Sequence, residues 1–288
     1  MKNMNKLSTL NFEEIYQDMF NTIYHYGSWT SDKVRTKYKD GTPAIRKRFI
    51  GYQFRFDNST DVVPLVRSRF IPTLDAIREL YWIWIQRSNK VQDLRDLGCK
   101  YWNQWEKSNG TIGLAYGYQL NKNTFESSNQ LSYIIDQIKN NPDSSRILTE
   151  MWNVNDLKFM SLTPCIHLTQ WSVIDGKIVL EVRARSQDFS LGMCANVYQY
   201  SILHKVVALE CNLQCGDFIY TIHDLHYYDR HESKLLEQFD NYNNLVEKPM
   251  LATVKINNFT NINEFKPSDI ELISDNKKLI KINYEIAI

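Results

Sequence analysis

Residues 166–185, IHLTQWSVIDGKIVLEVRAR, decide the fold, because they predict two strands joined by a tight turn. Asp175-Gly176 is the dipeptide preferred in two-residue hairpin connections. In the stretch Lys177 to Arg185, apolar residues alternate with mostly charged ones, so they share one face of a strand. The stretch Ile166 to Val173 is the expected antiparallel partner.

The elements on either side of this hairpin favour an α+β fold. Helical periodicity and strand alternation predict helices at 11–26, 74–87, 130–139 and 196–210, and strands at 49–56, 217–228, 251–256 and 279–286. Helices come first and hairpin-linked strands follow, with one inserted helix, which is typical of α+β proteins. No linker-like stretch divides the sequence, so we expect a single domain over residues 1–288.

The composition is that of a globular protein close to charge neutrality. The 34 basic and 33 acidic side chains leave a formal net charge of +1, so no nucleic-acid partner is expected. The longest apolar helical patch, at 80–85, is too short to span a bilayer, and residues 1–11 do not read as a secretory signal. We therefore expect a cytoplasmic protein without membrane contact. Five irregularly spaced cysteines predict no metal site.

Two segments combine residues that suit covalent chemistry. Pro164-Cys165 precedes the first strand of the hairpin, and Arg185-Ser186-Gln187-Asp188 ends the second. An arginine beside a thiol stabilises the thiolate, which is the nucleophilic form, or it can grip a phosphate with its planar fork. The alternative is a structural cysteine and a solvated arginine at a strand end.

Four further residues carry polar groups that are candidates for a site: Glu79, Asn196, His226 and Tyr228. Glu79 lies on a helix that is apolar on nearly all sides, which is a costly place for a carboxylate. His226 and Tyr228 share one face of a strand and either hold a sugar hydroxyl or form an ordinary half-buried pair. Asn196 either reads a uracil edge with its amide or caps the helix that follows.

In their order and spacing, these segments resemble the thymidylate synthase family over most of the chain. Residues 163–171, TPCIHLTQW, are similar to the segment of the family that carries its nucleophile. Residues 180–192, LEVRARSQDFSLG, are similar to the segment that carries its arginine and aspartate. Other similar segments, all in family order, are Val34-Arg35-Thr36 with Asp40-Gly41-Thr42, 79–82, 102–105, Ala115-Tyr116-Gly117, 216–218, 224–228 and the closing residues 285–288.

The resemblance implies a thymidylate-synthase-like domain, with a mixed or antiparallel twisted sheet covered by helices, that forms a homodimer through the sheet. It also implies catalytic roles. Cys165 would attack C6 of dUMP, Glu79 would move protons through water, and Tyr116 would help to remove the C5 proton. For the cosubstrate 5,10-methylenetetrahydrofolate, Asp188 would bind the pterin, Trp102 would wall the folate side, and the tail ending at Ile288 would close the site.

The resemblance implies nucleotide contacts as well. Arg35, Arg185 and Ser186 would hold the phosphate, together with Arg146 from the partner subunit. Asn196 would read the uracil ring, and His226 and Tyr228 would hold the 3′ hydroxyl.

The sequence departs from the family pattern near the nucleotide. Ser145 stands where an arginine is usual, with Arg46 or Arg48 as possible substitutes; Cys194-Ala195 replaces Pro-Phe, Ile166 replaces a frequent histidine, and His223 replaces a glycine.

Three activities are therefore open: thymidylate synthase, a dUMP hydroxymethylase in which water captures the methylene intermediate, and a non-catalytic nucleotide- or RNA-binding member. Asn196 favours uracil over cytosine, and Trp102 favours methylation by shielding that intermediate. Retention of Cys165, Glu79 and Tyr116 argues against the non-catalytic form.

Overall fold

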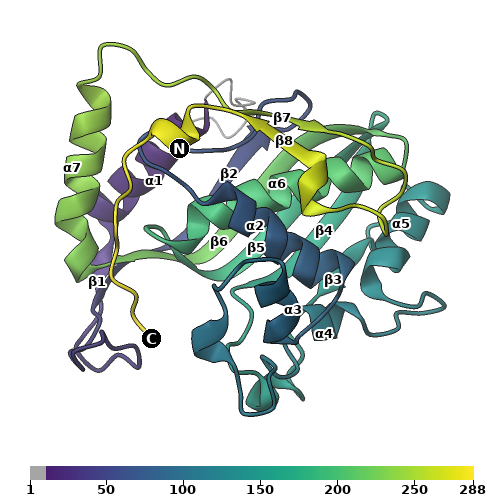
Figure 1. Cartoon of the computed structure of the whole chain (residues 1–288), viewed down its shortest axis with the longest axis horizontal. Helices are drawn as coiled ribbons and strands as arrows, with labels where there is room; N and C mark the ends of the chain where they lie inside the picture. The colour runs from purple at the N-terminus through teal and green to yellow at the C-terminus, as the bar shows by residue number, and fades with distance from the viewer. Residues whose placement is uncertain (1–10) are drawn as a thin grey trace.

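The computed structural model describes residues 11–288, and its centre is a six-stranded sheet (Figure 1). The strand order is β1-β2-β6-β5-β4-β3. The strands are β1 (Ser28–Trp29), β2 (Arg46–Asp57), β3 (Leu148–Glu150), β4 (Ile166–Ile174), β5 (Lys177–Asp188) and β6 (Gln214–Tyr228). All neighbours are antiparallel except β5 and β6. A parallel pair needs a crossover, and helix α6 supplies it, so the predicted mixed sheet is confirmed.

The predicted hairpin is present as β4 and β5. Ile174 pairs with Lys177, and the two turn residues Asp175 and Gly176 have φ of 51° and 74°. Two positive φ angles are what a tight hairpin turn of the primed type requires.

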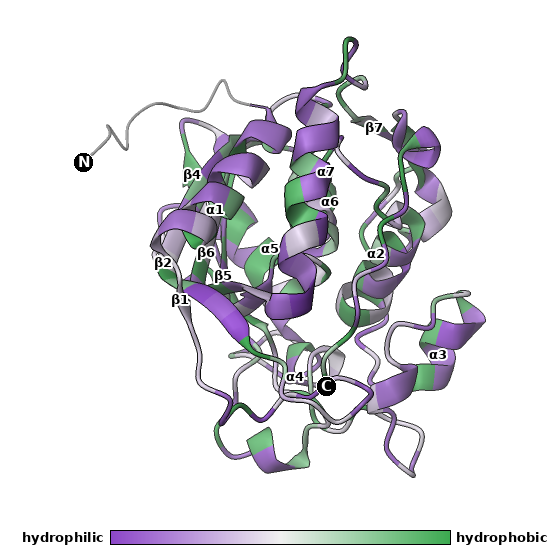
Figure 2. Ribbon diagram, turned by 90° about the vertical axis from the view of Figure 1, so that its left-hand side faces the viewer, coloured by the Kyte–Doolittle hydropathy of each residue, from purple (hydrophilic) through white to green (hydrophobic). Residues whose placement is uncertain are grey.

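Helices cover one side of the sheet, as Figure 2 shows for α6, α7 and α2. The helices are α1 (Phe12–Tyr26), α2 (Thr73–Leu80), α3 (Val91–Asp96), α4 (Gly117–Leu120), α5 (Gln130–Asn140), α6 (Gly192–Glu210) and α7 (Glu232–Asn243). α6 packs on β5, β6 and α2 and is buried on most sides, as its mostly apolar sequence requires.

The predicted helix at 74–87 changes its character halfway. After Leu80 the chain continues as a π-helical turn over Tyr81–Ile85, whose residues Trp82, Ile83 and Trp84 are buried. Such wide turns occur frequently at functional sites. This one begins two residues after Glu79.

The C-terminal part corrects one strand prediction. The strand predicted at 251–256 is present as β7 (Thr253–Ile256), and it pairs with β8 (Ile270–Ile273), which was not predicted. Residues 279–286 form no strand, because no neighbouring strand lies beside them: the Ile280 carbonyl accepts from the Phe70 amide, and the Asn283 carbonyl accepts from Lys234 Nζ.

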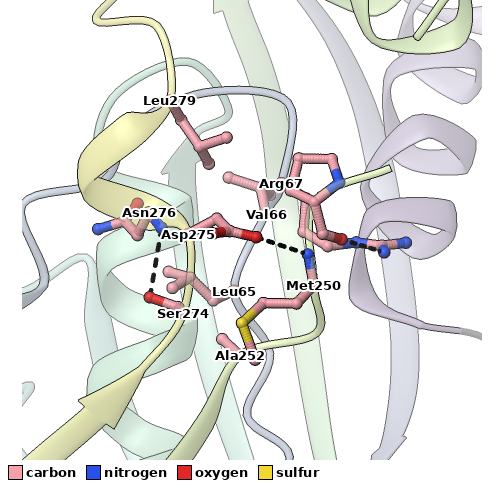
Figure 3. A pocket seen from close by; sticks show the side chains of 10 residues that line it. Leu65, Val66, Arg67, Met250, Ala252, Ser274, Asp275, Asn276 and Leu279 are labelled. Carbon is pink, nitrogen blue, oxygen red and sulfur yellow. Dashed lines mark hydrogen bonds between the residues drawn. The ribbon is translucent and has the colours of Figure 1, made fainter. Parts of the chain in front are cut away.

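Figure 3 shows how this C-terminal part is anchored. The Met250 amide donates to Asp275, and Arg67 donates to the Pro249 carbonyl. The cavity between these segments has a volume of about 10 Å³, which holds at most one water. It is a packing defect and offers no ligand site.

Two expectations, on membrane spans and on an N-terminal signal, can be compared with the structure only in part. Within residues 11–288 no helix combines the length and apolar character needed to cross a membrane. The expectation that residues 1–11 form no secretory signal concerns a segment of which residues 1–10 lie outside the described part of the chain.

Candidate active site

Cys165 lies immediately before β4, where the hairpin brings Arg185 beside it. Ile166 pairs with Ala184, and the Arg185 amide donates to the Cys165 carbonyl at 2.8 Å. The spacing of twenty residues in the sequence is thus the length of the hairpin. The Cys165 amide in turn donates to the hydroxyl oxygen of Tyr116 at 3.0 Å.

The Arg185 guanidinium holds the segment that carries the nucleophile. Nε donates to the Pro164 carbonyl at 2.8 Å, and Nη2 donates to the Thr163 carbonyl at 3.0 Å and to its Oγ1 at 2.9 Å. The guanidinium also lies over the Trp152 ring, 5.4 Å from its centroid. These contacts leave Nη1 as the group that can meet a phosphate.

Burial governs the protonation of Cys165. It raises the pKa of the thiol, while the nearby Arg185 charge and the hydrogen bond with Tyr116 act in the opposite direction. Arg185 therefore favours the thiolate, as the sequence predicts, but does not outweigh the loss of hydration.

Glu79 is buried and bonded to two donors from distant parts of the chain. Trp102 Nε1 donates to Oε1 at 2.5 Å, and Gln199 Nε2 donates to Oε2 at 3.0 Å. Burial raises the pKa of Glu79, and the two hydrogen bonds only partly offset this. The expected costly carboxylate is present, and a raised pKa suits a group that exchanges protons near neutrality.

Tyr116 is held in a strained backbone conformation. Its φ is +47° and its ψ is −104°, a region that non-glycine residues rarely occupy. Gly117 follows because a Cβ there would lie 2.3 Å from the Ser88 carbonyl oxygen. The Tyr116 ring meets the Trp102 ring edge to face at 5.2 Å. Tyr116 thus connects Cys165 with the group around Glu79.

Asp188 and Asn196 lie where β5 leads into α6. Asp188 Oδ1 accepts the amides of Ser190 at 2.8 Å and Leu191 at 3.2 Å. Asn196 is in the second turn of α6, so the alternative that it caps this helix is wrong. Its Nδ2 lies 3.5 Å from Gln187 Oε1, a marginal bond that leaves the amide available to a ligand.

His226 and Tyr228 lie near the end of β6, as predicted. Parallel pairing places Asp188 opposite His226, whose Nδ1 is 3.2 Å from Asp224 Oδ1. The rings of His226 and Tyr228 meet at 5.5 Å. Burial is the main cause that raises the pKa of Tyr228 to about 12, and Asp188 and Cys165 add to the rise. The sugar-binding candidates therefore border the same site.

The remaining predicted residues lie at its margins. Ser186 is half-buried opposite Asp224, and Arg35 is exposed in the loop before β2. Ile288 is exposed, and its amide and carbonyl both bond to Lys37 of the same loop.

Arg146 is not brought to Cys165 within the chain. Leu148 pairs with Gln170 and Glu150 with Leu168, so Arg146 is level with a point roughly 20 Å along β4 from Cys165. Its side chain is exposed and lines a surface cavity of about 520 Å³ with Phe125 and Tyr133.

The residues that depart from the family pattern differ in their burial. Ile166 and Cys194 are buried, and Cys194 Sγ lies 3.6 Å from the buried Arg69. His223 is exposed, whereas its neighbour Asp224 is buried. Successive side chains of a strand point to opposite faces, so the exposed His223 points away from the face that carries Asp224.

Arg46 and Arg48, considered as substitutes for the missing arginine, are paired with Asp224 at 3.7 and 3.4 Å.

Sequence reasoning gave no role to two residues of this site. Gln199 fixes Glu79, and Gln187 accepts the Tyr220 hydroxyl at 2.8 Å while facing Asn196. The available signal was a glutamine among the mostly apolar residues of the helix, three residues after Asn196. Within the described part of the chain, no group of three or more His, Cys, Asp or Glu could hold a metal ion.

The fold is α+β, and its site brings together a cysteine thiol, a buried carboxyl group and the guanidinium of Arg185. A sequence profile of the family described as thymidylate synthase matches residues 14–288. The chain belongs to the thymidylate synthase family. It is 54% identical to a thymidylate synthase of Fusobacterium nucleatum over 96% of this chain and 98% of that one. It is 40% identical to that of Bacillus phage phi3T over 96% and 99%.

The fold agrees with this assignment. The solved thermostable thymidylate synthase A from Bacillus subtilis superposes with a TM-score of 0.89 at 38% identity. The match covers 97% of this chain and all of that one. The expected α+β thymidylate-synthase-like fold is confirmed, and the chain is a folate-dependent methyltransferase of this family.

Proposed function

We propose that the chain converts dUMP to dTMP through a covalent bond between Cys165 and C6 of the uracil. 5,10-Methylenetetrahydrofolate supplies both the one-carbon unit and the hydride, so dihydrofolate is the second product. The observation that carries the proposal is the position of the Cys165 thiol between Arg185 and Tyr116, next to a buried Glu79. Covalent addition makes C5 nucleophilic and so divides one difficult step into easier ones.

The same groups have complementary tasks in this reaction. Arg185 fixes the Thr163-Pro164 backbone and so holds the Cys165 thiol in one orientation. Its Nη1 binds the phosphate. Arg35 and Ser186 complete the phosphate site. Tyr116 removes the C5 proton, and Glu79, held by Trp102 and Gln199, passes protons through water.

Base and sugar recognition fall to the ends of β5 and β6. The Asn196 amide faces the uracil edge, where its donor and acceptor match O4 and N3-H. His226 and Tyr228 hold the 3′ hydroxyl.

The residues present fit the folate cosubstrate. Asp188 uses Oδ1 to bind its own loop, and Oδ2 remains to accept an N-H of the pterin. The buried Trp102 ring lines the folate side and keeps water away, and the tail ending at Ile288 closes over it.

A homodimer formed through the sheet supplies Arg146. The sheet leaves apolar side chains exposed, among them Ile50 on β2 and Ile174 at the end of β4, and Arg183 on β5 is exposed as well. Such a face suits a self-complementary interface. Arg146 then reaches the site of the partner subunit, because it lies far from Cys165 in its own chain.

Residues 11–288 act as one domain, since one contiguous core joins α1, the sheet and the C-terminal segment. A cytoplasmic location is consistent with the supply of a free nucleotide and folate.

The first experiment is a reaction of the purified chain with dUMP and 5,10-methylenetetrahydrofolate, followed by dihydrofolate absorbance and product mass. Stoichiometric dTMP and dihydrofolate are expected. A hydroxymethyl product with tetrahydrofolate left unoxidised would refute the proposal and support the hydroxymethylase. The similar relatives are thymidylate synthases, which argues against that alternative. No turnover would refute both enzyme functions.

Intersubunit complementation tests the dimer. Cys165→Ala and Arg146→Ala subunits should each be inactive or weak alone. After they are mixed by unfolding and refolding, activity should return, because one site of the mixed dimer has both residues intact. Failure of the mixture, with dimers present by light scattering, would refute the sharing of Arg146.

A further inference from the structure

One arginine outside the site joins two distant segments of the chain. Arg230 follows β6, in the 3₁₀ turn Asp229–His231. Its Nη2 donates to Asp40 Oδ2 at 2.8 Å, and its Nη1 donates to Glu285 Oε2 at 2.9 Å. Asp40 belongs to the loop that also carries Arg35, and Glu285 belongs to the C-terminal tail.

The loop side of this contact is well defined. Asp40 Oδ1 accepts the Thr42 hydroxyl at 2.7 Å and the Thr42 amide at 3.0 Å. These bonds, with help from Arg230, lower the pKa of Asp40 to about 2, so its charge is constant over the working pH range. The guanidinium also lies over the Tyr38 ring, 4.0 Å from its centroid. Tyr38 is buried and donates to Asp229.

The tail side is also anchored beside Arg230. His231 Nε2 donates to the Glu285 carbonyl at 2.8 Å. Three residues on, Ile288 exchanges two backbone hydrogen bonds with Lys37, at 2.8 and 2.9 Å. The tail therefore meets the loop directly at Lys37 and indirectly through Arg230.

We propose that Arg230 is a positioning residue that couples the loop carrying Arg35 to the docking of the C-terminal tail. The inference rests on the proposed function, in which Arg35 binds the phosphate and the tail closes over folate. When phosphate fixes the loop, it also favours docking of the tail, because the loop and the tail both bond to the guanidinium of Arg230. A planar fork with two separate N-H edges can serve two carboxylates and stack on Tyr38 at once, which a lysine ammonium cannot.

The sharpest test uses Asp40, which bonds to Arg230 but not to the tail. Tail docking is measured without ligand, as the rate at which carboxypeptidase removes Ile288 from the folded protein. Asp40→Asn should speed this release about two- to fivefold, the range for exposed ion pairs. The same substitution in an Arg230→Gln background should have no further effect, since the connection is already cut. Glu106→Gln, which disrupts the exposed pair with Arg95, is the matched control and should leave release unchanged.

Two results would overturn the coupling: unchanged release in Asp40→Asn, or an undiminished effect of Asp40→Asn in the Arg230→Gln background. Unchanged thermal melting of the variants establishes that the fold is intact. Arg230→Lys should restore less than half of the lost protection.

A second arm separates this inference from the proposed function. dUMP should slow tail release in the native protein, whereas in Arg230→Gln it should bind but protect several-fold less. Equal protection in both would refute the coupling. If dUMP does not bind to the native chain, the proposed function is refuted, and the ligand-free comparison still decides whether Arg230 links loop and tail.

Discussion

Gln199→Leu is expected to weaken the fold by an amount that depends on pH. The Gln199 amide is buried and donates to the Ala76 carbonyl at 2.7 Å as well as to Glu79 Oε2 at 3.0 Å. A neutral hydrogen bond contributes about 1 kcal/mol, and one to a charged group about 1.5–3 kcal/mol. With Glu79 ionised, the free energy of unfolding should therefore fall by about 2.5–4 kcal/mol.

The sign of the pH dependence follows from Glu79. Burial raises its folded-state pKa above the unfolded value, so the folded state holds the proton more tightly. The stability this provides is full below the ordinary glutamate pKa and is lost as pH rises through the folded-state pKa. Loss of Gln199 raises the folded-state pKa further, because one bond to the carboxylate disappears. The deficit of the variant should thus be larger at alkaline pH than at acid pH.

Urea unfolding at about pH 5 and about pH 8 measures this difference, which should be about 0.5–2 kcal/mol. Asn276→Leu is the matched control. Asn276 is also buried, but its amide bonds only to the Ile71 backbone, at 2.7 and 2.9 Å, so its deficit should be the same at both pH values. When kcat/KM is plotted against pH, the limb of the curve that reflects titration of Glu79 should move to higher pH in Gln199→Leu. A deficit independent of pH, or a limb that moves to lower pH, would refute this account of Glu79.

Four other substitutions test the site. Cys165→Ala should abolish dTMP formation without lowering the melting temperature; residual turnover at the native rate would exclude the covalent mechanism. Arg185→Ala should weaken dUMP binding by about 10- to 100-fold, the worth of one charged hydrogen bond, and deoxyuridine binding far less, as titration calorimetry can compare. Gly117→Ala should destabilise by about 1–3 kcal/mol in urea, because its Cβ would lie 2.3 Å from the Ser88 oxygen; a neutral result would mean that the turn relaxes freely. Trp102→Phe removes the donor to Glu79 but keeps a ring, so product mass should remain that of dTMP while the Glu79 limb moves to higher pH; an unmoved limb would contradict the role of the indole N-H.

Local patterns in the sequence predict the elements that depend on local chemistry. The β4–β5 hairpin follows from alternation and Asp175-Gly176, and the predicted helix at 130–139 nearly matches α5, which Asn129 caps through the Ser132 amide. Helix α7 was missed, although Leu235, Phe239 and Tyr242 have helical spacing, because these few apolar residues stand among polar ones. The strand expected at 279–286 shows the opposite error. Alternation there reflects which side chains meet the surface of the protein, and a strand also needs a neighbour.

The residues of the candidate site also fall into those that local patterns place and those that only long-range packing places. Cys165 and Arg185 could be placed together because a hairpin joins them, and Asp188 with His226 because both end strands. By contrast, the bonds from Trp102 and Gln199 to Glu79 join positions 23 and 120 residues away. Only the packing of α2 on α6 and of the segment before α4 brings these groups together, and one sequence carries no direct sign of that packing.

The protonation of the site follows from this packing and constrains the order of events. Burial raises the pKa of both Cys165 and Glu79, and hydrogen bonds from neighbouring side chains offset this only in part. Arg185 cannot release the thiol proton on its own, because its attraction is smaller than the penalty of burial. In the proposed reaction, the negative charge on sulfur is therefore expected to develop together with the bond to C6. Tyr116 bonds to the Cys165 backbone and contacts Trp102, which in turn binds Glu79, so the proton-exchanging groups form one connected set beside the thiol.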